Sequence, residues 1–122
     1  MRVVGISPSP RDDQQAAKGH LALGRECAEI LGLDISLRAE DFESYAAFVG
    51  PDYGVVTAES CQALHLVAQQ EGLLLDPSYT SKAMAGLLTR VRTGWWRPEQ
   101  SLIFLHTGGT PALFAYAKNL GY

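Results

Sequence analysis

Short apolar runs alternate along the chain with longer segments in which apolar residues recur at every third or fourth position. Three of the runs, at 2–6, 73–75 and 102–105, are followed closely by proline or glycine, which is typical of buried strands that end in a turn. Strands that are apolar throughout and separated by helices favour a parallel sheet covered on both sides. The pattern therefore predicts an α/β fold of three layers, with helices on both faces of a mostly parallel sheet.

Four helices are predicted between and after these runs. Thr57 is a good N-cap for the second helix, and Gly72 supplies the left-handed residue that commonly ends a helix. Pro111 favours the start of the last helix, because a proline at the first helical position sacrifices no hydrogen bond. The end signals place the four helices at about 12–32, 57–72, 77–94 and from 111 onward.

Residues 34–56 are acidic and only weakly patterned, and their secondary structure is left open. Gly50-Pro51-Asp52 within this region indicates a turn. Three strands with four helices would make a thin sheet, so a further strand is expected from this region or from outside the chain. We therefore expect the chain to be part of a domain.

The composition, with 47% hydrophobic and 19% charged residues among 122, is that of an ordinary globular domain. The formal net charge is −3 and no basic cluster is present, so neither nucleic acid nor a membrane is an expected partner. No long apolar segment is seen, which predicts a cytoplasmic location. Cys27 and Cys61 lie in apolar helical patterns and are expected to be buried and reduced. Three scattered histidines predict no metal site.

Candidate chemistry gathers at three places where a strand or loop leads into a helix: 53–55, 76–82 and 106–109. In open α/β sheets, ligands bind just outside the carboxyl ends of the strands. The adjacent glycines Gly108 and Gly109 allow a ligand to approach the backbone closely and can form an anion-binding nest, although an ordinary tight turn uses the same dipeptide.

Tyr79 follows Asp76-Pro77 and can project into such a crevice. There it would be either an acid–base group or a half-buried tyrosine whose hydroxyl is satisfied. Thr107 can bond to its own turn or present its hydroxyl to a ligand. Lys82 is expected to be a solvated lysine in the first turn of the third helix.

Three motifs give the chain a resemblance to a known family through their order and spacing. They are Tyr53-Gly54-Val55, the run EGLLLDPSYTSKAMAG at 71–86, and the run HTGGTPALFAY at 106–116. Together they resemble the C-terminal region of the D-cysteine desulfhydrase and 1-aminocyclopropane-1-carboxylate deaminase family. These are pyridoxal-phosphate enzymes with the fold of the tryptophan synthase β subunit. The resemblance implies that residues 1–122 are the C-terminal portion of the large domain of such an enzyme.

The resemblance also implies roles for single residues. Tyr79 would lie over the cofactor and take part in proton transfer, and Tyr53 would line the same pocket. Thr107 would lie beside the pyridine nitrogen of the cofactor, where a hydroxyl leaves the ring a weaker electron sink than an aspartate does. The cofactor-binding residues implied in this way are Thr107, Gly108, Gly109 and Thr80.

Differences within the family narrow the implied activity. The deaminases carry Glu where Thr80 stands and Leu where Thr107 stands. The chain therefore resembles D-cysteine desulfhydrase more closely, which implies α,β-elimination of a small D-amino acid to pyruvate, ammonia and sulfide. Asp52, Val56 and Ser81 replace a glycine, a proline and a glycine that are usual in the motifs.

The family's Schiff-base lysine and glycine-rich phosphate loop belong to an N-terminal portion, and none of Lys18, Lys82 and Lys118 matches that lysine. We therefore expect the chain to be inactive alone, and to self-associate or to pair with a companion chain. Two other interpretations stay open. One is a non-catalytic remnant that binds a partner or small ligand through the same crevice. The other, a small flavodoxin-like nucleotide-binding or regulatory module, is disfavoured because residues 7–10 form no phosphate loop.

Overall fold

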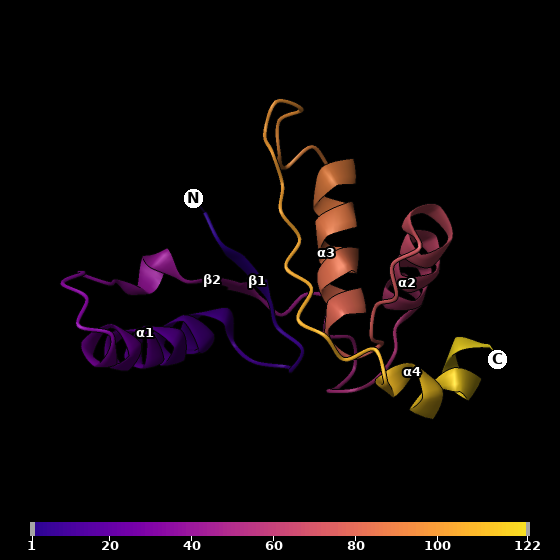
Figure 1. Ribbon diagram of the computed structural model, residues 1–122, viewed down its shortest axis with the longest axis horizontal. Coiled ribbons are helices and arrows are strands. Elements are labelled where there is room, and N and C mark those ends of the chain that lie inside the picture. Colours follow the sequence, from indigo (N-terminus) through magenta and orange to yellow (C-terminus); the bar gives the residue numbers. More distant parts are fainter. Residues whose placement is uncertain (1, 122) are drawn as a thin grey trace.

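The computed structural model describes residues 2–121 (Figure 1). Two short 3-10 turns, at residues 39–41 and 117–120, accompany the helices and strands. The elements in chain order are β1 (Val4–Ile6), α1 (Asp13–Ile30), β2 (Glu43–Tyr45), α2 (Ala58–Glu71), α3 (Thr80–Arg92) and α4 (Ala112–Ala115).

The start of α1 and both ends of α2 confirm the local signals of the sequence. The Asp12 carboxylate accepts a hydrogen bond from the Gln15 N–H at 3.0 Å and so caps α1. At the start of α2, Thr57 Oγ1 accepts from the Ser60 N–H while Ser60 Oγ accepts from the Thr57 N–H. Gly72, at φ +67°, ends α2 in the left-handed conformation. Within residues 2–121, none of these helices has the length and apolar character needed to cross a membrane.

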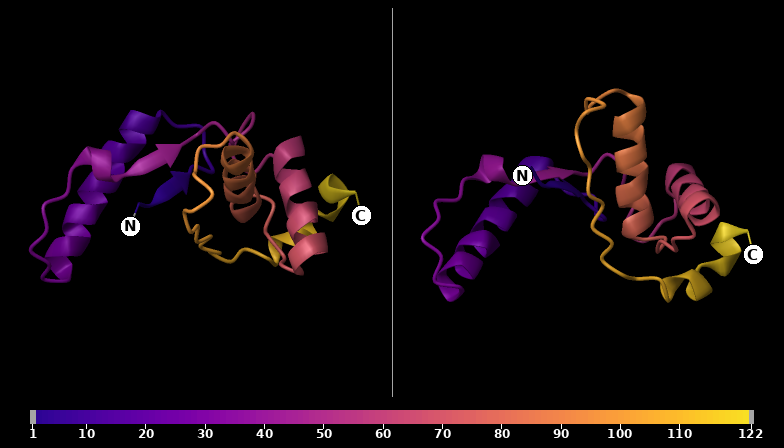
Figure 2. Two further views of the ribbon diagram at one scale, coloured as in Figure 1. Left: turned by 90° about the horizontal axis from the view of Figure 1, so that it is seen from above. Right: turned by 45° about the horizontal axis from the view of Figure 1, so that its top comes forward.

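A small parallel sheet lies between α1 and α3 (Figures 1 and 2). β1 pairs with β2 so that Val4 lies opposite Glu43 and Ile6 lies opposite Tyr45. α1 packs against β2, α3 packs against β1, and α2 lies along α3 on the side away from the sheet. The arrangement is that of an α/β fold with a parallel sheet and helices on both of its faces.

The strand predictions need correction in two places. β2 lies in the acidic region that the hydrophobic pattern left open, and Arg2 forms a two-pronged ion pair with Glu43 beside it. Residues 73–75 and 102–105 were predicted as strands, but they are extended segments outside the two-stranded sheet. A strand requires a partner edge for its backbone hydrogen bonds, and no described residue offers one to either segment.

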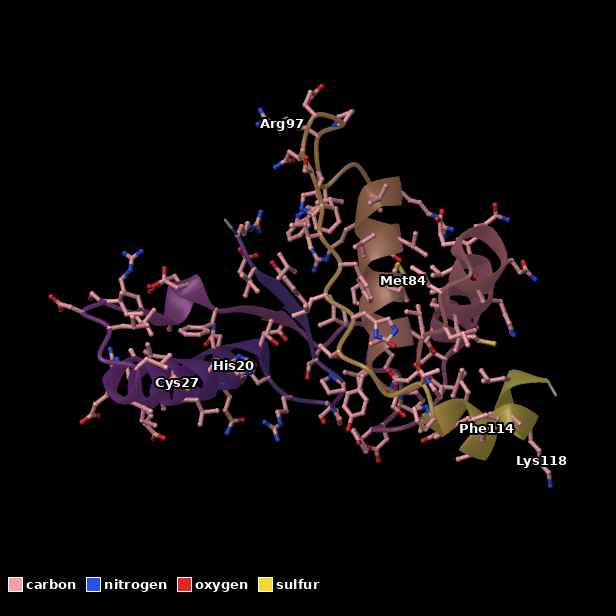
Figure 3. All side chains as sticks on the ribbon, in the orientation of Figure 1. His20, Cys27, Met84, Arg97, Phe114 and Lys118 are labelled. Carbon is pink, nitrogen blue, oxygen red and sulfur yellow. The ribbon has the colours of Figure 1, made fainter. Side chains whose placement is uncertain are left out.

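The core lies between α2 and α3 rather than around the sheet. Met84 on α3 faces α2 (Figure 3). Leu75 belongs to the same cluster and is fully buried. Other apolar side chains are uncovered: Ile103 is 85% exposed, and Leu105 is exposed too. The prediction of a buried Cys27 is wrong, because this side chain is exposed on α1, and Cys61 is half-buried. The buried members of the core are Ala63, Leu64, Val67, Leu75, Met84, Ala85 and Leu120.

Candidate active site

Asp76 organises the loop that leads into α3. Its carboxylate is only 1% exposed and accepts four hydrogen bonds from the next turn of chain. Oδ2 accepts from the N–H groups of Ser78 and Tyr79, each at 2.8 Å. Oδ1 accepts from the N–H and the hydroxyl of Thr80, each at 2.7 Å. The carboxylate therefore satisfies the free N–H groups at the start of the helix and fixes the backbone of Tyr79.

These hydrogen bonds also decide the charge of Asp76. Burial by itself would raise the pKa of the carboxyl group, because it disfavours the charged form. The hydrogen bonds from Thr80, Tyr79 and Ser78 outweigh burial and hold the pKa of Asp76 below its ordinary value. Asp76 is therefore a carboxylate at neutral pH.

Tyr53 and Tyr79 form a pair of hydrogen-bonded phenols. Their hydroxyl oxygens are in direct contact, and their ring centroids lie 5.9 Å apart at an interplanar angle of 66°. Tyr53 is 52% exposed and Tyr79 is 45% exposed, so both rings are open to a ligand. The hydrogen bond with Tyr79 is the main cause that raises the pKa of Tyr53 above its ordinary value, and partial burial adds to it.

His106 connects the loop at 106–110 to the extended segment before Asp76 by a hydrogen bond. The Gly108 N–H donates to Nδ1 of His106 at 3.1 Å, so Nδ1 carries no proton and Nε2 donates to the Leu74 carbonyl at 3.0 Å. The loop also touches Asp76, since a Cβ at Gly109 would lie 2.8 Å from Asp76 Cβ. Gly109 has φ +89°, so only glycine fits this approach without strain.

The structure brings some of the predicted site residues into contact and leaves others apart. Tyr53 and Tyr79 meet, and Gly109 backs onto the Asp76 loop. Gly108 has φ +91°, and a Cβ there would meet nothing within 4 Å, so its surroundings are open. Thr107 is exposed in the turn closed by the hydrogen bond between Gly108 and His106. Within residues 2–121 it makes no side-chain hydrogen bond to Tyr53 or Tyr79. Thr80 is buried with its hydroxyl held by Asp76, so a direct contact of Thr80 with the cofactor stays a prediction.

Two residues near the tyrosines lie within the motifs but have no role assigned to them by the sequence. The hydrophobic pattern marks Asp76 as the end of an apolar run, but an aspartate followed by serine and threonine within four residues is also a recognisable capping signal. Tyr116, from the C-terminal segment, accepts a hydrogen bond from the Ser78 hydroxyl at 3.5 Å. A Cβ at Gly54 would lie 3.1 Å from the Tyr116 hydroxyl, so this phenol closes the site from a third side.

Lys82 differs from its prediction as a solvated lysine. Its side chain is 1% exposed, and Nζ donates a hydrogen bond to the Val49 carbonyl at 2.6 Å. Burial lowers the pKa of the amine, and the negative charge of Asp52 opposes that shift. The amine points to the backbone before Tyr53 rather than into the open site.

Comparisons with known proteins relate the chain to two groups of enzymes. No family model matches the chain. D-cysteine desulfhydrase of Yersinia enterocolitica is 38% identical over 114 residues, which are 93% of this chain and 34% of the relative. The chain is homologous to the C-terminal third of D-cysteine desulfhydrases and 1-aminocyclopropane-1-carboxylate deaminases.

Further relatives from both branches support this assignment. D-cysteine desulfhydrase of Serratia proteamaculans is 51% identical over 93% of the chain and 33% of the relative. The 1-aminocyclopropane-1-carboxylate deaminase of Burkholderia ambifaria is 35% identical over 96% of the chain and 34% of the relative. A crystal structure of an ACC deaminase homologue superposes with a TM-score of 0.82 at 34% identity, over 98% of this chain and 35% of that one. The prediction of a partial α/β domain of this family is confirmed, and the chain spans about a third of its relatives' length.

Proposed function

We propose that the chain forms the C-terminal part of a pyridoxal-phosphate-dependent lyase, most like D-cysteine desulfhydrase. The hydrogen-bonded, exposed pair of Tyr53 and Tyr79 carries this proposal, because it places two proton-carrying groups at one open site. The reaction proposed is the elimination that converts a D-cysteine and a water to pyruvate, ammonia and hydrogen sulfide. The 51% identity to the Serratia desulfhydrase, against 35% to the Burkholderia deaminase, supports this branch of the family.

The residues present suit a flat, phosphorylated cofactor on one side. The backbone at Gly108 is open, so a ring can approach it without meeting a side chain. In this proposal Thr107, Gly108 and Gly109 would hold the cofactor, and the Thr107 hydroxyl would serve its pyridine nitrogen. When bound, pyridoxal phosphate supplies an electron sink for the charge that develops on the amino acid. Lys82 cannot hold it covalently in this arrangement, because the amine is buried against Val49.

The two phenols have different tasks in this proposal. Tyr53 keeps its proton through the neutral range, since its pKa is raised above the ordinary value, mainly by the hydrogen bond with Tyr79. In this proposal the two hydroxyls share one hydrogen bond, and Tyr79 is the member that gives or takes a proton at the substrate. Asp76 holds the Tyr79 N–H at 2.8 Å, so the backbone that carries this phenol is fixed.

A companion polypeptide is proposed because a large apolar cavity of about 550 Å³ separates β1 from the extended segment at 101–105. β1 is paired through one edge only, and no described residue makes a backbone hydrogen bond to 101–105. The Arg90 guanidinium borders the same cavity, and its buried Nε has no hydrogen-bond partner within residues 2–121. An inserted strand would pair with the free edges and bring an acceptor to Arg90.

We expect the purified chain to release no pyruvate from D-cysteine above the rate of free pyridoxal phosphate, because none of Lys18, Lys82 and Lys118 matches the family's Schiff-base lysine. Co-expression with the N-terminal two thirds of the Serratia desulfhydrase should give a co-purifying complex that releases pyruvate. Ile103→Asp tests the interface, since Ile103 is exposed and lines the cavity, and this variant should complement less well than the unchanged chain. Turnover by the chain alone, or equal complementation by Ile103→Asp, would contradict the proposed assembly.

The role of Thr107 is tested in the same complex by Thr107→Val, which removes the hydroxyl at nearly constant volume. The absorption band of the bound cofactor should shift, and its dissociation constant should rise by roughly fivefold, as expected for loss of one hydrogen bond worth about 1 kcal/mol. Thr93→Val, at the far end of α3, is the control and should leave both unchanged. An unchanged spectrum in Thr107→Val would remove Thr107 from the cofactor.

A further inference from the structure

Lys82 is a buried cation with an unusual set of neighbours. Its ammonium is 1% exposed and has one hydrogen bond, to the Val49 carbonyl at 2.6 Å. No carboxylate among residues 2–121 lies within ion-pair distance of it. Removing a charge from water without a close counter-ion is costly, and a Met side chain could fill the same space without that cost. The position of this amine therefore points to a constraint other than packing.

Two contacts join the same two pieces of chain. Lys82 binds the carbonyl of Val49, and Tyr79, three residues before Lys82, binds Tyr53, four residues after Val49. The segment 49–54 is therefore joined to the start of α3 twice, through its first residue and through its next-to-last residue. It contains two glycines, Gly50 and Gly54, whose backbones are the least restricted by a side chain and adopt positive φ, at +80° and +74°.

We propose that Lys82 is a positioning residue that fixes segment 49–54 to the first turn of α3 and thereby holds the Tyr53 hydroxyl against Tyr79. The contact is inferred from the geometry alone, and only its importance for turnover rests on the proposed function. Lysine suits this task because an ammonium forms a stronger hydrogen bond to a carbonyl than a neutral donor does.

Asp52 strengthens the tie from within the segment. Its carboxylate accepts a hydrogen bond from the Tyr53 N–H at 2.6 Å, and its charge attracts the Lys82 ammonium. The attraction pulls the backbone that carries Tyr53 toward α3.

The test is Lys82→Met in the chain labelled with [13Cζ]-tyrosine, with Tyr53→Phe used to assign the Tyr53 signal. The pKa of Tyr53 should fall toward the ordinary phenol value of about 10, because its hydrogen bond with Tyr79 is lost. Direct loss of a positive charge would move this pKa upward instead, so the direction separates position from charge. The other groups that act on Tyr53, namely Tyr116 and Asp76, are unchanged in the variant.

Lys18→Met is the matched control, since Lys18 is exposed on α1, and it should leave the Tyr53 titration as it was. A Tyr53 pKa that stays or rises in Lys82→Met overturns the proposal. Neither result depends on cofactor binding or turnover, so failure of the proposed enzyme activity would not alter the outcome.

A second measurement leaves Lys82 in place and covers the case in which Lys82→Met fails to fold. Acetylation of Lys82 by a small anhydride requires the segment 49–54 to open. In Tyr79→Phe, which removes the second contact, Lys82 should be acetylated about fivefold faster than in the unchanged chain, the effect of losing one hydrogen bond. The exposed Lys18 and Lys118 should react at equal rates in both proteins. An unchanged rate at Lys82 would show that the two contacts are independent, and this result would overturn the proposal.

Discussion

Tyr79→Phe should lower the turnover of D-cysteine by about 10²–10⁴-fold in the complex of this chain with its N-terminal counterpart, which is the usual contribution of a general acid–base group. The ring and its packing stay, and only the hydroxyl that meets Tyr53 is lost. Cofactor binding should therefore persist, since the change falls on proton transfer. Steady-state release of pyruvate, together with a titration of the cofactor, measures the two effects separately.

Tyr45→Phe is the matched control for this substitution. The Tyr45 hydroxyl also donates a hydrogen bond, to Glu43 at 3.1 Å, but it lies in β2, outside the proposed site. Its loss should leave turnover unchanged. Full turnover by Tyr79→Phe would remove Tyr79 from the chemistry, whereas an equal loss in both variants would trace the effect to stability.

Asp76→Ala should cost the chain at least about 2 kcal/mol of unfolding free energy. The reason is that the buried carboxylate accepts from three N–H groups and one hydroxyl, and a buried donor left without a partner costs about 1–3 kcal/mol. The midpoint of urea unfolding, at an unchanged slope, measures the loss. Asp34→Ala, at an exposed position, should change the same midpoint by less than about 0.5 kcal/mol.

The contribution of Asp76 also has a pH dependence of defined sign. Its pKa is lower in the folded chain than in the unfolded chain, so its stabilisation is complete above the unfolded value of about 3.9. The stabilisation is lost as the pH falls below that value and through the folded pKa. The Asp76→Ala variant should therefore lose less stability over this acid range than the unchanged chain. Parallel pH profiles of the two proteins would contradict the assignment.

The local signals of the sequence determined where helices begin and end. Asp12, Thr57 and Gly72 act within three or four residues of themselves, through a cap or a left-handed backbone, and such signals need no knowledge of the rest of the fold. The three motifs likewise identified the loops that meet at the site and the family to which the chain is related.

Only the tertiary structure decided how distant segments meet. The contact between Tyr53 and Tyr79 joins residues 26 positions apart, and the tie between Lys82 and Val49 spans 33 positions. A first-turn lysine looks the same in sequence whether its amine meets water or a buried carbonyl. β2 has a polar middle residue and becomes a strand because β1 offers it an edge. Residues 102–105 are apolar throughout yet stay outside the sheet, because hydrophobicity favours burial but only a partner edge completes a strand.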